Sequence, residues 1–289
     1  MAILRTPDFV PIPNVSEHLW PKAGLGAYLR TNLCYVARHQ KFANLTTPSL
    51  FTELVQRRKL ANRDLRMAML ADKVAVKSVI ADILGNDWVI PTLWHGTDLP
   101  MTPEWTVSFV LKSRHGCNQN IFFQQGIDSW LSARERAQGW LRQSYGKWLD
   151  EWLYNHIPKG LLIETYVGEP DKLPLDYKIY TFAGQATHIQ VHLDRGRRHR
   201  WLLFDRNWKR VSAASADPDP LKPHSLPAML DAAEALGRGF DFVRNDFYEI
   251  NGKPLFGEMT FYPGSGLDKF HPLSLDATLG EYWLEAGGR

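Results

Sequence analysis

Apolar side chains recur every three or four positions in two long stretches of the chain. The first stretch covers residues 47–85 and includes the segment LVQRRKLANRDLRMAMLADKVAVKSVIADILG. This spacing places side chains on one face of a helix, so it predicts helices that end at Gly85. The second stretch, residues 130–156, predicts another helix. Trp148 and Trp152 lie one turn apart in it and are expected to pack in the core.

Strand patterns follow the helical ones. Residues 105–112 (WTVSFVLK) are rich in β-branched and aromatic side chains, and residues 160–167 (GLLIETYV) form a short apolar run typical of a buried strand. Alternating segments from 176 to 204 turn at Gly184 and predict antiparallel strands. Residues 225–236 predict a further helix. Helices followed by a series of strands, with more helices interspersed, indicate an α+β protein.

A hairpin is predicted where FDFVRNDFYEI and PLFGEMTF flank the dipeptide Asn251-Gly252. Asn-Gly favours the positive backbone angles of a tight two-residue turn. Asp246 and Glu258 lie on opposite arms, and two carboxylates can hold Mg²⁺, which prefers oxygen ligands. With a two-residue turn, the alternation of side chains puts these acids on opposite faces. A three-residue loop, or a one-residue bulge of the kind that Pro254 favours, would bring them onto one face.

Composition limits the classes of protein to consider. The chain has 289 residues, of which 44% are apolar and 22% are charged, as in ordinary globular proteins. A chain of this length can bury roughly 75% of the surface of its unfolded form, enough for one large core or for two to three subdomains. Thirty-four basic and 31 acidic residues give a net charge of +3, too small to indicate a nucleic-acid partner.

Cysteine content and the first residues bear on location. Cys34 and Cys117 stand far apart and lack the spacing of a zinc site or a disulfide scaffold, which favours a reducing cytoplasm. The segment MAILRTPDFVPIPNV has prolines and an aspartate where a signal peptide needs an apolar core. No run of about 18 apolar residues occurs, so we expect no membrane span.

Two lysines extend the chemistry that the hairpin suggests. Lys112 ends the predicted strand 105–112 and precedes the polar loop SRHGCNQN. An ammonium group at that place can meet a nucleotide phosphate while the loop covers it. The loop contains one glycine, Gly116, and is a poor phosphate cradle by composition. Lys73 follows Asp72 within a predicted helix. Taken alone, Lys73 and the hairpin acids are explained more simply as solvated surface groups.

Seven short segments occur in a specific order: LADK, FVLKSRHG, LLIETYVG, DYKIYTFAG, HLDR, FVRNDFY and FGEMTFYPGSG. Over residues 45–283 this series resembles the TupA-like family of the ATP-grasp superfamily. The resemblance implies an ATP-grasp fold, in which two α+β lobes with antiparallel sheets and helices enclose Mg-ATP. It also implies an N-terminal helical lead-in over 1–70, an N-lobe over 71–163, and a C-lobe with a metal-binding hairpin over 164–289.

The resemblance implies which residues hold the nucleotide. Lys73 and Lys112 look like the two lysines that bind ATP phosphates. Glu164 begins the segment similar to the adenine hinge, and Asp176 falls where an acid takes the ribose hydroxyls. The main chain of three more hinge residues would bind the base: Thr165, Tyr166 and Val167.

It also implies which residues carry the reaction. Arg244 resembles the arginine that stabilises the transferring phosphoryl group, and Lys178 would reach the phosphates or the acceptor. Asp246 and Glu258 look like the ligands of one or two Mg²⁺ ions, with Thr260 as a third ligand. The superfamily usually has Asn where this chain has Thr260, and a hydroxyl is a weaker neutral ligand. The TupA-like pattern also has Thr at this position.

The activity implied by the resemblance is ATP-dependent ligation of a carboxylate to an amine through an acylphosphate, in the synthesis of a surface polysaccharide or a peptide-like product. Two alternatives stay open at this point. One is a kinase that phosphorylates a hydroxyl group. The other is a nucleotide-binding partner of glycosyltransferases that has no turnover of its own.

The sequence indicates the substrates less clearly than it indicates the nucleotide site. The segment HLDRGRRHRW is densely basic, and its arginines would suit the carboxylate or phosphate of a uronic acid or a nucleotide sugar. A solvated hairpin tip explains the same segment. Arg195, inside the HLDR segment, is the best single candidate for a substrate contact. Whether Arg114 and His115 face the phosphates or only solvate their loop is also open. An amino acid is the expected amine.

Overall fold

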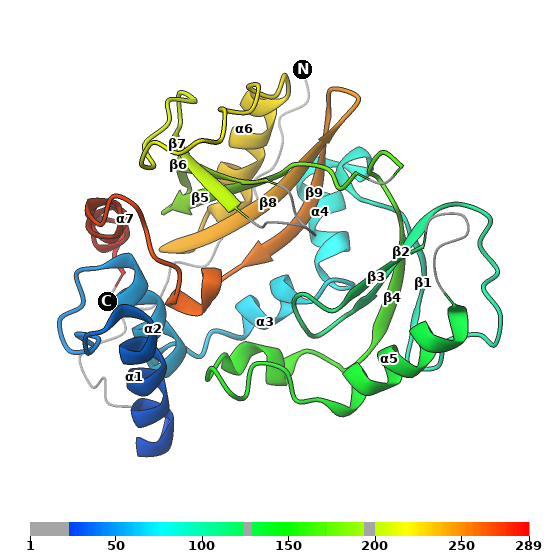
Figure 1. The fold of residues 1–289 in the computed structure, drawn as a ribbon, viewed down its shortest axis with the longest axis horizontal. Coiled ribbons are helices and arrows are strands. Elements are labelled where there is room, and N and C mark those ends of the chain that lie inside the picture. Colours follow the sequence, from blue (N-terminus) through cyan, green and yellow to red (C-terminus); the bar gives the residue numbers. More distant parts are fainter. Residues whose placement is uncertain (1–22, 124–128, 171, 194–199, 289) are drawn as a thin grey trace.

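The computed structural model describes residues 23–123, 129–170, 172–193 and 200–288. Figure 1 shows two sheets side by side, with the helices α3 and α4 between them. The α-helices are α1 (Leu25–His39), α2 (Phe51–Ala61), α3 (Leu65–Ala71), α4 (Val76–Leu84), α5 (Trp130–Arg142), α6 (Leu226–Gly237) and α7 (Ser274–Glu285). The described residues also contain the 3-10 helices η1 (Asn86–Trp88), η2 (Trp152–His156) and η3 (Pro263–Gly266). None of the described helices has the length and apolar character needed to cross a bilayer.

The first sheet is antiparallel with the order β1-β4-β2-β3. Its strands are β1 (Thr92–Gly96), β2 (Phe109–Ser113), β3 (Asn120–Phe123) and β4 (Leu161–Thr165). Leu111 and Ile163 on the two central strands are fully buried, in a core shared with Ala133 and Ala137 of α5. The helix therefore covers one face of this sheet, and the buried strand expected over 160–167 is confirmed.

The second sheet is also antiparallel, with the order β7-β6-β5-β8-β9. Its strands are β5 (Asp176–Phe182), β6 (Gln185–Leu193), β7 (Arg200–Asp205), β8 (Phe242–Ile250) and β9 (Lys253–Thr260). Helix α6 packs on one face. At one end of the other face, Phe51 of α2 packs against Phe182 and Trp283. The rest of that face carries polar side chains. The α+β class is confirmed, while the lobe limits at 70/71 and 163/164 stay a prediction.

The predicted hairpin is present, and it contains the one-residue bulge. Asn251 and Gly252 have φ values of 53° and 75°, as an Asn-Gly turn requires. Phe247 pairs with Phe256, whereas Asp246 pairs with Glu258, so Gly257 is the extra residue. A Cβ on Gly257 would lie 3.0 Å from the Asp246 carbonyl oxygen, which favours glycine at this position. The bulge brings the two acids onto one face.

The predicted helix over 130–156 is wrong in its second half. Helix α5 ends at Arg142, and only a 3-10 turn follows. Gly146 has a φ of 78°, and a Cβ there would lie 2.7 Å from the Glu151 carbonyl oxygen, so the chain turns sharply here. As a result, Trp152 is buried as predicted, but Trp148 is 74% exposed.

Candidate active site

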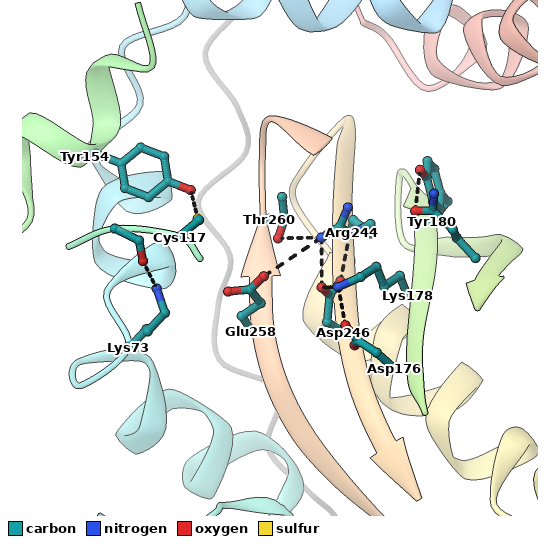
Figure 2. A network of polar contacts seen from close by, with 12 residues as sticks. Lys73, Cys117, Tyr154, Asp176, Lys178, Tyr180, Arg244, Asp246, Glu258 and Thr260 are labelled. Carbon is teal, nitrogen blue, oxygen red and sulfur yellow. Dashed lines mark hydrogen bonds and ion pairs between the residues drawn. The ribbon is translucent and has the colours of Figure 1, made fainter. Parts of the chain in front are cut away.

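Charged side chains from three strands form two rows across the polar face of the second sheet. The register places Lys178 of β5 beside Asp246 of β8, and Asp246 beside Glu258 of β9. The adjacent row contains Tyr180, Arg244 and Thr260 in the same strand order. Figure 2 shows Lys178, Arg244, Asp246, Glu258 and Thr260 converging, with Tyr180 set apart from them. The alternation of side chains, together with the bulge, thus brings three distant segments to one surface.

Asp246 is the centre of a buried ion-pair network. Arg244 donates from Nε to Oδ1 at 2.7 Å and from Nη2 to Oδ2 at 2.8 Å. Lys178 also donates to Oδ2 of Asp246, and its Nζ lies 2.7 Å from a carboxylate oxygen of Asp176. Burial lowers the pKa of Lys178, but Asp176 and Asp246 raise it by more. Two cations and two anions therefore lie together in a buried place, where burial raises the pKa of Asp246 and the nearby Arg244 and Lys178 oppose that rise.

Glu258 is the more accessible acid, with 34% of its side chain exposed. Arg244 Nη2 lies 4.0 Å from its Oε1 and donates to Thr260 Oγ1 at 3.2 Å. Burial raises the pKa of Glu258, but Lys73, Lys178 and Arg244 together bring it below its usual value. Since Lys73 belongs to the α3–α4 turn, the two sides of the site meet at Glu258.

Lys73 is held beside the loop that follows β2. Its Nζ donates to the Gly116 carbonyl oxygen at 2.5 Å, as Figure 2 shows. Asp72, only 3% exposed, accepts hydrogen bonds from Nε and Nη2 of Arg114 at 2.7 and 2.5 Å. Arg114 is therefore committed to Asp72. His115 is buried, and its Nδ1 accepts from the Gly160 N–H at 3.3 Å. Neither side chain of this pair is available to a phosphate in this arrangement.

Lys112 forms an ion pair with Glu164 on the neighbouring strand. The other oxygen of Glu164 lies 2.6 Å from Lys77 Nζ, which also donates to the Ile90 carbonyl oxygen at 2.7 Å. Burial raises the pKa of Glu164, but Lys112 and Lys77 lower it by more. Burial lowers the pKa of Lys112, and Glu164, Tyr248 and Glu258 raise it. The field of Glu258 thus reaches both predicted phosphate lysines.

The predicted hinge continues directly from β4. The Thr165 N–H donates to the Pro91 carbonyl oxygen at 3.2 Å, and the Tyr166 N–H donates to Ser108 at 2.9 Å. Both amides are therefore engaged in the sheet, and the assignment of Val167 and its neighbours to the base stays a prediction. The same holds for Asp176 as a ribose ligand, because its carboxylate is paired with Lys178.

The basic segment lies largely outside the described residues, and Arg195 is among those that the structure does not describe. Its last arginine, Arg200 on β7, forms an ion pair of 2.8 Å with Asp217. The role predicted for Arg195 therefore remains a prediction from sequence.

The donor set fits Mg²⁺ that is shared with phosphate. Among the described residues there is no group of three or more His, Cys, Asp or Glu side chains that could hold a metal alone. Asp246 and Glu258 supply two carboxylates on one face, and Thr260 supplies a hydroxyl. Mg²⁺ is commonly held by one or two carboxylates together with substrate phosphates. Both Asp246 oxygens now accept from cations, so a metal ion would have to replace one of these contacts.

Sequence reasoning missed Lys77 and the Asp72–Arg114 pair. Lys77 stands one helical turn after Lys73 in LADKVAVK. A lysine among the apolar residues of that helix was the available signal, because a buried ammonium needs partners. The pairing of Asp72 with Arg114 joins residues 42 apart and left no signal in the pattern of either segment.

The fold is that of an ATP-grasp protein. The sequence profile of the TupA-like ATP-grasp family matches residues 53–284, which is most of the chain. The chain belongs to this family. No curated protein gives a significant match.

Several solved structures are similar in fold at low sequence identity. D-alanine–D-alanine ligase from Bacillus anthracis, complexed with ATP, is 14% identical, with a TM-score of 0.45 over 75% of this chain and 64% of that chain. L-amino acid ligase from Bacillus licheniformis is 12% identical, with a TM-score of 0.44 over 77% and 47%. VanG D-Ala:D-Ser ligase from Enterococcus faecalis is 10% identical, with a TM-score of 0.46 over 78% and 62%. The chain spans less than two thirds of the length of each.

Proposed function

We propose that this protein is an ADP-forming ligase that joins a carboxylate to an amine through an acylphosphate. The observation that carries the proposal is the meeting of two sets of charges. Glu258 shares its sheet face with Asp246, Arg244 and Thr260, and Figure 2 shows Lys73, held at the Gly116 carbonyl oxygen, on the side of the site that Glu258 faces. Membership in an ATP-grasp family supports the nucleotide assignment.

Joining a carboxylate to an amine requires activation, because a carboxylate oxygen is a very poor leaving group. Transfer of a phosphoryl group from ATP provides that activation and needs mainly positioning and charge neutralisation from the protein. We assign Lys73 and Lys112 to the phosphates and Arg244 to the phosphoryl group in transfer. Arg244 is suited to this role because Asp246 and Thr260 fix its guanidinium group on the sheet.

Asp246, Glu258 and Thr260 would hold one or two Mg²⁺ ions. The ions would neutralise charge that develops on the phosphate oxygens. Lys178 stands beside Asp246 and Asp176, where its ammonium group helps to neutralise the two carboxylates and would reach the phosphates or the acceptor. Glu164, Thr165, Tyr166, Val167 and Asp176 are assigned to adenosine on the family pattern.

The finer assignments rest on the family alone. We propose a cytoplasmic enzyme that acts on a uronic acid, a nucleotide sugar or a related carboxylate, with an amino acid as amine. The product would be a surface-polysaccharide precursor or a peptide-like compound, and association with glycosyltransferases would follow from that role. No nucleic-acid partner is proposed.

The test measures ADP and inorganic phosphate with pooled uronic acids and pooled amino acids. Ligation releases both products in equal amounts, and ¹⁸O from a labelled carboxylate appears in the phosphate. A kinase gives ADP without free phosphate, and a non-catalytic partner shows only magnesium-dependent ATP binding. The Glu258→Gln variant is the control for contaminating ATPases, since it should lose all substrate-dependent release.

A further inference from the structure

The turn after the hairpin is left-handed over three successive residues. Gly264, Ser265 and Gly266 have φ values of 51°, 55° and 68°. This region is open to glycine but strained for serine, and such a residue persists only where its surroundings hold it in place. The turn begins three residues after Thr260, so it borders the charged face of the sheet.

Donors from α2 hold this turn. Gln56 Nε2 donates to the carbonyl oxygens of Ser265 and Gly266 at 2.8 and 3.0 Å. Lys59 Nζ donates to the Ser265 carbonyl oxygen at 3.2 Å and to its hydroxyl at 3.0 Å. Both donor side chains are almost completely buried. The turn is therefore fixed by the helix beneath it.

The Asp268 carboxylate folds back over the turn. A Cβ on Gly264 would lie 2.1 Å from Asp268 Oδ2 and 2.4 Å from its Cγ, so the carboxylate occupies the space that a side chain at 264 would need. Within the described part of the chain, the Asp268 carboxylate has no hydrogen-bond or ion-pair partner. Among the described residues, the turn thus presents a carboxylate that no other side chain occupies.

The charge of Asp268 reaches the row that contains Arg244. Burial raises the pKa of Tyr180, and the charges that act on its hydroxyl are those of Arg244, Asp268 and Asp246. Tyr180 lies beside Arg244 in the sheet register. The turn that carries Asp268 begins three residues after Thr260, which accepts a hydrogen bond from Arg244, so the carboxylate lies toward the end of the site where the phosphoryl group is proposed to be transferred.

On the basis of the proposed ligase function, we propose that Asp268 binds the ammonium group of the acceptor and selects primary amines that are positively charged at neutral pH. A carboxylate without a partner is a strong acceptor for an ammonium group, and charge-assisted hydrogen bonds are short and directional. Held in this way, the amine would be oriented toward the acyl group before it loses its proton to water. Amino acids and amino sugars both belong to this class.

The test compares a charged with an uncharged nucleophile. Pooled amino acids serve as charged amines, and hydroxylamine, uncharged at pH 7.5, traps an acylphosphate as a hydroxamate. Asp268→Asn should raise the KM for the amines about 10- to 100-fold, as expected for the loss of a charged hydrogen bond. Hydroxamate formation and the KM for ATP should stay at wild-type values. Asp231→Asn, an exposed change on α6, is the matched control and should alter neither reaction.

Gly264→Ala provides a second variant, since its Cβ would displace the same carboxylate. It should reproduce the selective loss with amines, provided that thermal unfolding shows a folded protein. Equal losses with amines and hydroxylamine, unchanged amine kinetics in Asp268→Asn, or a shifted magnesium requirement would overturn the assignment of Asp268. If the wild-type protein forms neither ADP with the pools nor hydroxamate, the ligase function itself fails, which is a distinct result.

Discussion

The two sides of the site differ in how their charges are compensated. On the second sheet, Lys178, Arg244 and Asp246 are paired with one another or with Asp176, and each is nearly inaccessible to solvent. On the first side, Lys73 donates to one carbonyl oxygen, and its neighbouring loop is tied down through Asp72. The paired charges on the second sheet resist change, because breaking any pair leaves a buried charge without a partner. Lys73 can instead exchange its neutral carbonyl partner for a phosphate.

This difference indicates that the two sides have different roles. The second sheet provides a preorganised surface for the phosphates and the metal ion, and the lysine side provides contacts that form when ATP enters. Preorganised charge is effective in phosphoryl transfer because it needs no rearrangement as the reaction proceeds. Substitutions on the two sides should therefore separate effects on stability from effects on nucleotide binding.

Asp246→Asn should have the largest effect. The substitution leaves Arg244 and Lys178 buried with one carboxylate fewer, so the free energy of unfolding should fall by about 3–5 kcal/mol. Turnover should fall by at least about 10²- to 10³-fold. Urea denaturation and ADP release measure the two effects. A variant with normal turnover would reject Asp246 as a metal ligand.

Glu258→Gln should lose turnover and keep its stability. Its side chain is partly exposed, and its distance of 4.0 Å from Arg244 indicates a weak ion pair. We expect turnover to fall by about 10²- to 10³-fold, while the free energy of unfolding changes by less than about 1 kcal/mol. The same assays apply. A large loss of stability would show that Glu258 belongs to the buried network.

Lys73→Ala and Lys112→Ala, on the lysine side of the site, should both weaken ATP binding but should differ in their effect on stability. Both should raise the Kd for ATP by about tenfold or more, as expected for lost charged hydrogen bonds to phosphate. Only Lys112→Ala should also lower stability, because it leaves Glu164 with Lys77 as its one close cation. Calorimetric ATP titration and thermal unfolding of both variants test this. Equal destabilisation by the two would contradict the comparison.

Glu151→Gln should change how stability depends on pH. Burial raises the pKa of Glu151 from 4.5 to about 7, against the opposing effects of Lys59 and Ser265. Between pH 4.5 and pH 7, the folded state therefore binds more protons than the unfolded state. The stabilisation that protonated Glu151 contributes is present below pH 4.5 and is lost as the pH rises through 7. Denaturation at pH 5 and 8 should show a smaller decline for the variant than for the wild type. Parallel declines would refute the shift.

Arg200→Ala should have the smallest effect. Its ion pair with Asp217 is partly exposed, and such pairs contribute about 0–1 kcal/mol. Turnover and the KM for ATP should stay at wild-type values in the ADP assay. A loss of turnover would show that the basic segment contributes to the active site.

The local pattern predicted most strands and the hairpin, because alternation and the Asn-Gly turn are properties of adjacent residues. The sequence predicts a bulge as one of two ways to bring the acids onto one face, with Pro254 as its expected cause. The bulge occurs instead at Gly257, where a Cβ would come within 3.0 Å of the Asp246 carbonyl oxygen, which favours glycine. The break after Arg142 was missed because Gln143 leaves the helical conformation, with φ −77° and ψ 145°, without a glycine or proline beside it to mark the end.

Part of the site could also be predicted from short segments of sequence. Lys73, Lys112, Asp246 and Glu258 stand in an ordered series of segments that resembles one family. The ion pairs that form only in the folded chain could not be predicted. Arg114 meets Asp72, and Lys77 meets Glu164, across gaps of 42 and 87 residues. Such ion pairs depend on how the sheets and helices pack, which no local periodicity records.

A crystal structure with a non-hydrolysable ATP analogue and Mg²⁺ tests the central claim most directly. The account predicts oxygens of Asp246 and Glu258 at about 2.0–2.1 Å from the metal ion. It also predicts that Lys73 Nζ leaves the Gly116 carbonyl for a phosphate oxygen. A triphosphate bound away from the two acids, with Lys73 still on Gly116, would contradict it.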